Sequence, residues 1–166
     1  LYPLKINKTY LSNNKSDYAL NLELNITKDE ARLSDIDMNR INLYLGNDVY
    51  MSSTLVMWMK TYLKKIIVFC SDSDETFNIP TSSIEVMGLS DKLLDYEDFG
   101  FEAFALLQEL FFMPYKFNFI AIKNLDMLKS SGSRNFTIKF VFDRDLPNGY
   151  IPRVEHFSLS STPIIN

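Results

Sequence analysis

Cysteine, histidine and clustered carboxylates are the residues of this 166-residue chain whose chemistry could serve a catalytic or metal site. The chain has one cysteine, Cys70, and one histidine, His156. A thiol beside an imidazole could form a nucleophile–base dyad. Cys70, however, ends an apolar run, where a free thiol usually acts as a small buried hydrophobic group. No G-x-S-x-G element supplies an activated serine. We therefore predict no catalytic residue and no enzymatic activity.

The acidic segment "SDSDE" groups Asp72, Asp74 and Glu75 and is the strongest candidate for an ion site. A calcium-binding EF-hand loop would need a third oxygen ligand and then glycine where this chain has Thr76 and Phe77. A solvated loop is therefore favoured, and the sequence leaves open whether the loop binds an ion. One cysteine and one histidine cannot form a zinc cluster. We predict no metal site and no cofactor.

The composition indicates a soluble globular protein that forms a single domain over residues 1–166, since 46% of its residues are apolar and 23% are charged. The net charge is −4 and no run of basic residues exceeds two, which disfavours nucleic-acid binding. A single cysteine fits a reducing compartment. The chain begins without methionine and ends in an apolar run, so we expect a fragment of a longer protein.

Hydrophobic periodicity predicts an α+β domain of mostly antiparallel β-sheet, sandwich-like, with two main α-helices. The helices are expected at 49–64 and 101–113. Residues 27–40 are expected to be a solvated connection, and the segment after residue 80 has no clear assignment until the second helix. Strands are expected at 4–11, 18–26, 41–46, 65–71, 75–80, 116–122, 136–142 and 156–162.

The second predicted helix carries an apolar arc that we expect to be core. At about 100° per residue this arc contains Ala103, Phe104, Leu106, Leu107, Leu110, Phe111 and Met113. Phe101 and Phe112 fall beside Gln108, off the edge of the arc. They are either covered by neighbouring chain or form a candidate docking edge for another part of the protein.

The apolar stretch at 101–122 is not predicted to enter a membrane. It is interrupted by Glu102, Gln108, Glu109, Pro114 and Lys116, whereas a membrane span needs about 20 predominantly apolar residues. An aromatic sugar-binding platform on a β-sandwich is a further alternative. It is disfavoured because most phenylalanines fall at core-facing alternate positions and the chain has one tryptophan.

The helix–proline–strand unit "LLQELFFMPYKFNFIAI" resembles the "LLQEYF-x-x-P-x-KF-x-F" segment of the TssF (VasA/ImpG) family of type VI secretion systems. The matching residues are Leu106, Leu107, Gln108, Glu109, Phe111, Pro114, Lys116, Phe117 and Phe119. Three further family-like pieces occur in the expected order: "YPLKI", "INLYLGND" and "FSLSSTPIIN". The last of these contributes Pro163 and Asn166. The resemblance singles out these residues as positions of the structural core.

The chain departs from the family pattern at several positions. Ala103, Phe104 and Ala105 replace the usual Gly-Tyr-Arg, Tyr115 replaces an acidic residue, and Thr162 stands where cysteine is common. These differences describe a divergent member and put any arginine-mediated contact of the typical protein in doubt.

The resemblance implies a structural role without catalysis. TssF proteins are baseplate wedge components, and the implied partners are a TssG-type protein, a second TssF copy, TssK, TssE and the VgrG hub. The implied location is the cytoplasmic side of the inner membrane, where the baseplate docks without direct membrane insertion. A baseplate wedge protein of a phage or phage-tail-like particle is the alternative within the same class, and a β-sandwich carbohydrate- or ligand-binding module is the alternative outside it.

Overall fold

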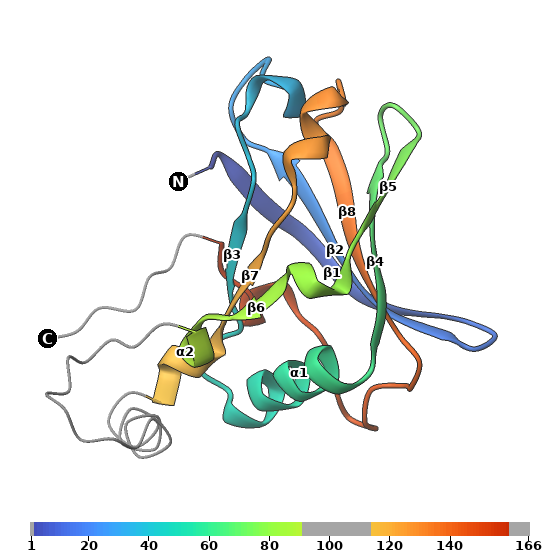
Figure 1. Cartoon of the computed structure of the whole chain (residues 1–166), viewed down its shortest axis with the longest axis vertical. Coiled ribbons are helices and arrows are strands. Elements are labelled where there is room, and N and C mark those ends of the chain that lie inside the picture. Colours follow the sequence, from blue (N-terminus) through green and yellow to red (C-terminus); the bar gives the residue numbers. More distant parts are fainter. Residues whose placement is uncertain (1, 91–113, 160–166) are drawn as a thin grey trace, which may run out of the picture.

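The structure of the chain, a computed structural model, describes residues 2–90 and 114–159. Its strands form two sheets, and every pairing in the described part is antiparallel (Figure 1). The predicted α+β class with mostly antiparallel sheet is therefore confirmed. The five-stranded sheet has the order β1 (Leu4–Asn14), β2 (Asp17–Ile26), β8 (Asn135–Phe142), β4 (Leu63–Cys70) and β5 (Glu75–Ile79). The three-stranded sheet has the order β3 (Ile41–Tyr44), β7 (Phe119–Ile122) and β6 (Ile84–Val86).

The two sheets share one hydrophobic core. In β8, the central strand of the larger sheet, Phe136, Ile138 and Phe140 alternate toward the core and are at most 1% exposed. Ile120 and Ile122 of β7 belong to the same core from the smaller sheet. Burying each such side chain stabilises the fold by roughly 1.5–3 kcal/mol relative to leaving it exposed. The alternation of apolar residues thus places the two sheets face to face.

Helix α1 (Val49–Thr61) closes one end of the space between the sheets (Figure 1). Its inner face carries Met51, Leu55 and Met59, which are all buried. The helix begins after Asp48, whose carboxylate accepts a hydrogen bond of 3.0 Å from the Met51 amide. It is shorter than the predicted 49–64, because the chain enters β4 directly after it and pairs there with β8.

The opposite end is covered by the short 3-10 helices η1 (Leu33–Asp35) and η4 (Asp126–Ser130), which contact each other. The expectation that residues 27–40 form a solvated connection is wrong in part. Leu33 and Met38 are each 1% exposed and belong to the core. Two isolated apolar residues in a polar segment show no periodicity, so their burial could not be inferred from spacing.

The predicted count of two main helices is not matched in the described part of the chain. Besides α1 it contains α2 (Met87–Ser90), which is a single turn. The helix predicted at 101–113 lies outside the described residues. Strand β6 was not predicted, because three residues are too few to show alternation.

Two predicted strands begin later or are replaced by turns. Residues 116–122 begin with the 3-10 helix η3 (Pro114–Asn118), and only β7 is extended. Of the strand predicted at 156–162, residues 160–162 lie outside the described residues. Up to residue 159 the chain forms the 3-10 helix η5 (Val154–His156) and then one isolated bridge between Ser158 and Tyr44.

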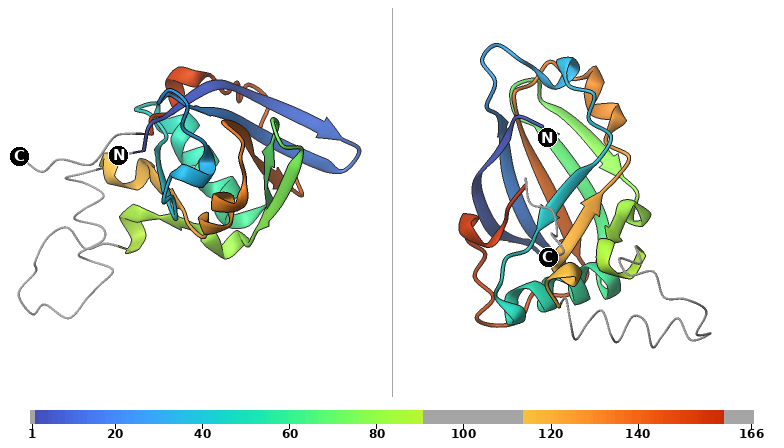
Figure 2. Two further views of the ribbon diagram at one scale, coloured as in Figure 1. Left: turned by 90° about the horizontal axis from the view of Figure 1, so that it is seen from above. Right: turned by 90° about the vertical axis from the view of Figure 1, so that its left-hand side faces the viewer.

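This last segment lies between the two sheets and partly closes the sandwich. Ser158 pairs with Tyr44 of β3 from the smaller sheet, and η5 lies against β1 from the larger one. Viewed from above, the strands surround a common centre (Figure 2). The architecture is a sandwich that approaches a closed barrel.

Candidate functional site

Cys70 and His156 are not brought together. Cys70 is fully buried at the end of β4, and this burial raises the pKa of its thiol. His156 belongs to η5, where its Nδ1 accepts a hydrogen bond of 3.3 Å from the Arg153 amide. The end of β4 and η5 lie in different parts of the molecule (Figure 1). A buried thiol with a raised pKa and no imidazole beside it is a poor nucleophile.

The acidic loop after β4 uses its first carboxylate to fasten the loop before β8. The Oδ2 atom of Asp72 accepts hydrogen bonds from the amides of Arg134 at 2.7 Å and Asn135 at 3.0 Å, and from the Ser133 hydroxyl at 3.0 Å. The Asn135 side chain donates to Oδ1 at 3.1 Å. These bonds, led by that of the Asn135 side chain, lower the pKa of Asp72 to about 2. The carboxylate thus acts as an anion held by N–H and O–H donors.

The other acidic residues of this loop do not join Asp72 around a common point. Ser131 and Ser73 hydrogen-bond to Glu75 and lower its pKa. Asp74 adopts a left-handed backbone conformation with φ of 56° at the turn. Within residues 2–90 and 114–159, no group of three or more histidine, cysteine or acidic side chains could hold a metal ion.

Three of the four family-like pieces meet at one place, which we call the motif junction (Tyr44, Gly46, Asn118, Phe119 and Ser158). Tyr44 pairs with Phe119 across the sheet, and their rings lie 4.6 Å apart between centroids. Tyr44 also exchanges backbone hydrogen bonds of 2.8 and 2.9 Å with Ser158. Asn118 donates its side-chain amide to the Gly46 carbonyl at 2.9 Å. Segments separated by more than a hundred residues are therefore joined there.

Gly46 allows the close approach that the motif junction requires. Its φ of +79° is a left-handed conformation that favours glycine, and a Cβ there would lie 3.1 Å from the His156 carbonyl oxygen. The glycine in "INLYLGND" thus lets the chain turn out of β3 while η5 packs against it.

The proline-containing motif packs closely on α2. A Cβ added to Gly88 would lie 2.8 Å from Cδ1 of Phe117 and 3.0 Å from its Cα. In the same 3-10 turn Lys116 is buried, and Phe119 is buried in β7. Pro114 begins η3 and is exposed. Among the described motif residues, Lys116, Phe117 and Phe119 are thus in the packed interior or at its margin.

The remaining motif residues lie outside the described residues. They are Leu106, Leu107, Gln108, Glu109, Phe111, Pro163 and Asn166, together with the candidate docking edge of Phe101 and Phe112. Their assignment to core or docking edge stays a prediction.

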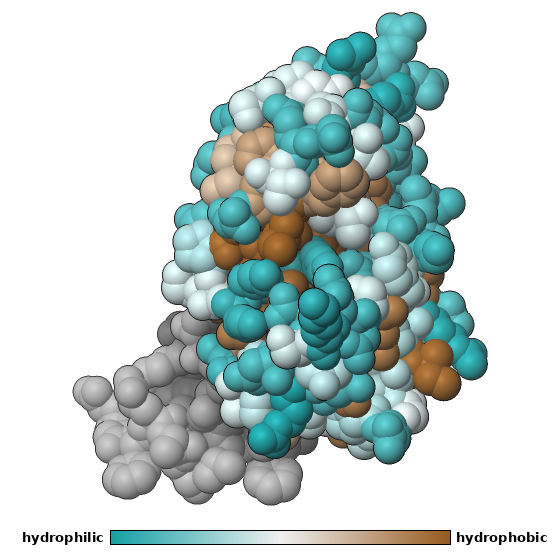
Figure 3. Space-filling view, turned by 90° about the vertical axis from the view of Figure 1, so that its right-hand side faces the viewer, coloured by the Kyte–Doolittle hydropathy of each residue, from teal (hydrophilic) through white to brown (hydrophobic). Residues whose placement is uncertain are grey.

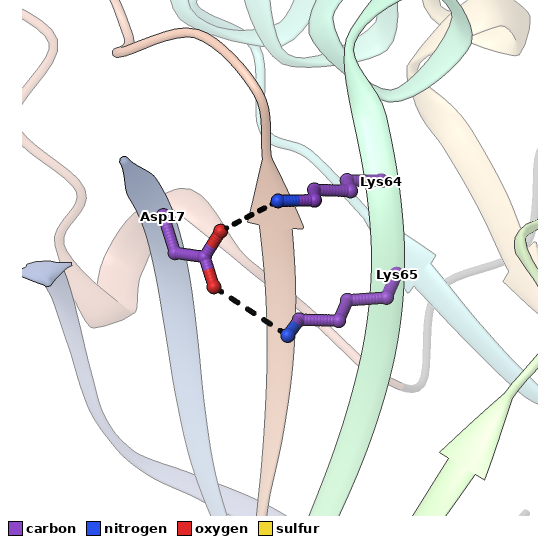
Figure 4. Close-up of polar contacts among 3 residues, drawn as sticks. All are labelled: Asp17, Lys64 and Lys65. Atoms are coloured by element: carbon purple, nitrogen blue, oxygen red, sulfur yellow. Dashed lines mark hydrogen bonds and ion pairs between the residues drawn. The ribbon is translucent and has the colours of Figure 1, made fainter. Parts of the chain in front are cut away.

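A charged cluster at the start of β2 is not apparent from the sequence. Asp17 accepts from Lys64 Nζ at 2.9 Å and lies 3.4 Å from Lys65 Nζ, so it links β2 to β4 across β8 (Figure 4). The pairing of β4 with β8 shifts register between Leu63 and Lys65, which marks a β-bulge. A bulge lets two successive side chains share one face, as Figure 4 shows for these lysines. The Lys64 hydrogen bond is the main cause that lowers the pKa of Asp17.

In the part of the chain that the structure describes, no helix is long and apolar enough to cross a membrane.

The outer face of the five-stranded sheet is a candidate surface for protein contacts. That face carries the Asp17 cluster and, on β4, the exposed side chain of Phe69.

Comparison with known proteins identifies a family for this chain. A family model described as "Type VI secretion system, TssF" matches residues 1–166. No curated protein matches the sequence. A solved structure, the TssK-TssF-TssG baseplate subcomplex of the type VI secretion system determined by cryo-electron microscopy, contains a similar chain. The TM-score is 0.78 at 24% identity over 96% of this chain, which shows a shared fold.

The present chain spans 30% of the length of that similar chain. The family model, by contrast, matches this chain from its first residue to its last. With the motifs joined at one place in the fold, the conclusion is that this chain belongs to the TssF family of type VI secretion systems.

Proposed function

We propose that this chain is a structural part of a type VI secretion baseplate that acts by holding other proteins in place, without catalysing a reaction. The family match over residues 1–166 carries the proposal. The fold shared with a chain of the TssK-TssF-TssG subcomplex supports it. The residues considered for catalysis and for an ion site are compatible with this role, since Cys70 is a buried thiol and Asp72 is bonded to backbone amides.

TssG- and TssK-type proteins are the first proposed partners, because the similar chain was solved in a subcomplex with proteins of these names. A second TssF copy, TssE and the VgrG hub complete the proposed assembly by analogy with the family. The proposed location is the cytoplasmic face of the inner membrane. The chain itself is proposed to be one domain, residues 1–166, of a longer wedge protein.

The carbohydrate-binding alternative is not favoured by the described surface. A sugar platform needs several aromatic side chains exposed together on one face. Three described aromatic side chains are strongly exposed, and they belong to different elements: Tyr50 to α1, Phe69 to β4 and Tyr115 to η3. Among the described residues of the sheets, Phe69 is thus the one aromatic that is strongly exposed.

Reconstitution tests the proposed function directly. The longer protein that carries this chain is purified with an affinity tag and mixed with TssG- and TssK-type proteins from the same source. We expect a stable complex on size-exclusion chromatography that contains all three proteins. The proposal is refuted if the tagged protein does not bind the TssG-type or the TssK-type protein although all three proteins are folded.

A further inference from the structure

The outer face of the five-stranded sheet differs in charge from the rest of the chain. Residues that alternate with the buried positions of β1, β2, β8 and β4 point away from the core. Those with charge are Lys5, Lys8, Asp17, Glu23, Lys65 and Lys139, and the β-bulge adds Lys64 to this face. Five lysines and two carboxylates leave an excess of three positive charges there, although the whole chain has a net charge of −4.

Apolar side chains lie on the same face. Ile66, Val68 and Cys70 of β4 are fully buried, so the intervening Ile67 and Phe69 point outward. Phe69 is 38% exposed. Figure 3 shows several hydrophobic groups among hydrophilic ones on the side of the molecule where β4 and β5 lie in Figure 1. An antiparallel sheet that simply faces water would be expected to carry polar residues at such positions.

The register places the apolar and basic residues next to one another. Ile67 is opposite Lys139 of β8, and Lys139 is in turn opposite Asn21 of β2. Phe69 is opposite Thr137 of β8 and Thr76 of β5. An apolar centre bordered by charged side chains is the usual arrangement of a protein–protein contact surface.

Two of these lysines have no carboxylate paired with them among the described residues, whereas Lys8 is opposite Glu23 of β2. Lys64 and Lys65 pair with Asp17, whereas within the described residues Lys5 and Lys139 form no ion pair. Lys8 lies over the Tyr10 ring at 5.0 Å from its centroid. Unpaired positive charges beside exposed apolar groups attract a partner of the opposite charge.

We propose that the outer face of the five-stranded sheet, defined by Lys5, Lys8, Lys139, Ile67 and Phe69, docks a partner protein whose contact surface is acidic around an apolar centre. Charge complementarity identifies the class of partner. The assignment to a baseplate protein rests on the proposed function, and the charge of the surface does not.

Two double variants with the same change in charge test the proposal. Lys5→Glu with Lys139→Glu reverses two lysines of the outer face, and neither forms an ion pair within the described residues, so the fold should be retained. Lys28→Glu with Lys60→Glu reverses two exposed lysines elsewhere, in the loop after β2 and in α1. A third variant, Phe69→Ser, removes the exposed aromatic side chain of the apolar centre and leaves every charge. Circular dichroism verifies that each protein is folded.

The first measurement is binding of polyglutamate, a probe that does not depend on the identity of the partner. Wild type and Lys28→Glu/Lys60→Glu are expected to bind it at low salt and to release it at roughly 0.5 M NaCl. Lys5→Glu/Lys139→Glu is expected to bind at least tenfold more weakly. Equal binding by all proteins overturns the proposal. The proposal is also overturned if wild type binds a DNA duplex more tightly than polyglutamate and Lys5→Glu/Lys139→Glu no longer binds the duplex. The outer face would then be a nucleic-acid surface.

The second measurement is the affinity of the longer protein for TssG- and TssK-type proteins. Lys5→Glu/Lys139→Glu and Phe69→Ser are each expected to weaken one of these complexes at least tenfold, with the control double variant within about twofold of wild type. If wild type binds neither protein but polyglutamate binding depends on the outer face, the proposed function is refuted and the basic surface stands. If every variant binds both proteins as wild type does, the outer face is not a docking surface.

Discussion

At the scale of single residues, the molecule uses its polar chemistry to hold loops in place. The sequence offers Asp72 as a candidate metal ligand. In the structure its carboxylate instead accepts hydrogen bonds from the Ser133 hydroxyl and from the amides of Arg134 and Asn135. Cys70 likewise contributes to the core. Reactive residue types therefore serve packing and loop attachment in this domain.

Asp72→Asn should lower stability by about 1 kcal/mol near neutral pH, because the donors of residues 133–135 lose an anionic acceptor whose charge is partly screened by solvent. The pKa of about 2 lies below the ordinary 3.8, so the carboxylate stabilises the fold fully above about pH 4. This contribution is lost as the pH falls through 2. Urea unfolding between pH 7 and pH 2 measures it, with Asp74→Asn as control. A pH profile identical to that of wild type would show that Asp72 does not act as an anion.

Glycine positions offer a second test at this scale. Gly46→Ala and Gly149→Ala each place a side chain at positive φ, at a cost of about 1–2 kcal/mol. Gly46 also meets the His156 carbonyl, whereas nothing lies within 4 Å of the Cβ position of Gly149. Gly46→Ala should therefore cost about 1 kcal/mol more in chemical unfolding. Equal losses would mean that η5 does not pack tightly on Gly46.

At the scale of elements, helix α1 and several 3-10 turns close the ends of two sheets in the described part of the chain. The inner face of α1 is buried, while Val49, Tyr50 and Met57 on its other side are exposed. The helix is thus apolar on both sides, and only the three-dimensional arrangement shows which side faces the core.

Two substitutions in α1 test this orientation. Leu55→Ala should cost about 2–5 kcal/mol, because Leu55 is 1% exposed and its truncation leaves a cavity. Met57→Ala, at a position 54% exposed, should change stability by less than about 0.5 kcal/mol. Thermal and urea unfolding of the two variants provide the comparison. A larger loss for Met57→Ala than for Leu55→Ala would reverse the assigned orientation.

At the scale of the whole molecule, the two sheets depend on one core, which contains residues from β1 to β8 and from α1. Neither sheet buries its inner face without the other, so the domain should unfold as one unit. The outer face of the larger sheet is the surface that we propose for a partner.

A single cooperative transition is accordingly expected when the chain is unfolded by heat, with coincident near- and far-ultraviolet circular dichroism. EDTA should leave the midpoint unchanged, because the Asp72 carboxylate is satisfied by protein donors. Two separated transitions would contradict the single shared core. A midpoint that falls with EDTA and recovers with added calcium would instead reveal a structural ion.

The sequence by itself determined those features that depend on neighbours along the chain. Alternation predicted the strands at 18–26 and 136–142, and an apolar run predicted the strand at 65–71. The four family-like pieces, led by "LLQELFFMPYKFNFIAI", predicted the family. The sequence did not predict strand β6, which has only three residues. It also did not predict the burial of Leu33 and Met38, which are isolated apolar residues in a polar segment. The second predicted helix remains a prediction of the sequence.

Only the tertiary structure decided what depends on distant residues. Asp72 meets donors about sixty positions later, the motif junction joins Tyr44 to Ser158, and the bulge at Lys64 turns two lysines toward Asp17. Side-chain alternation is a local property of an extended backbone, whereas register, bulges and the partner of a charge are set when strands pair. For that reason the charge and apolar centre of the outer face could be seen only after the strands were in register.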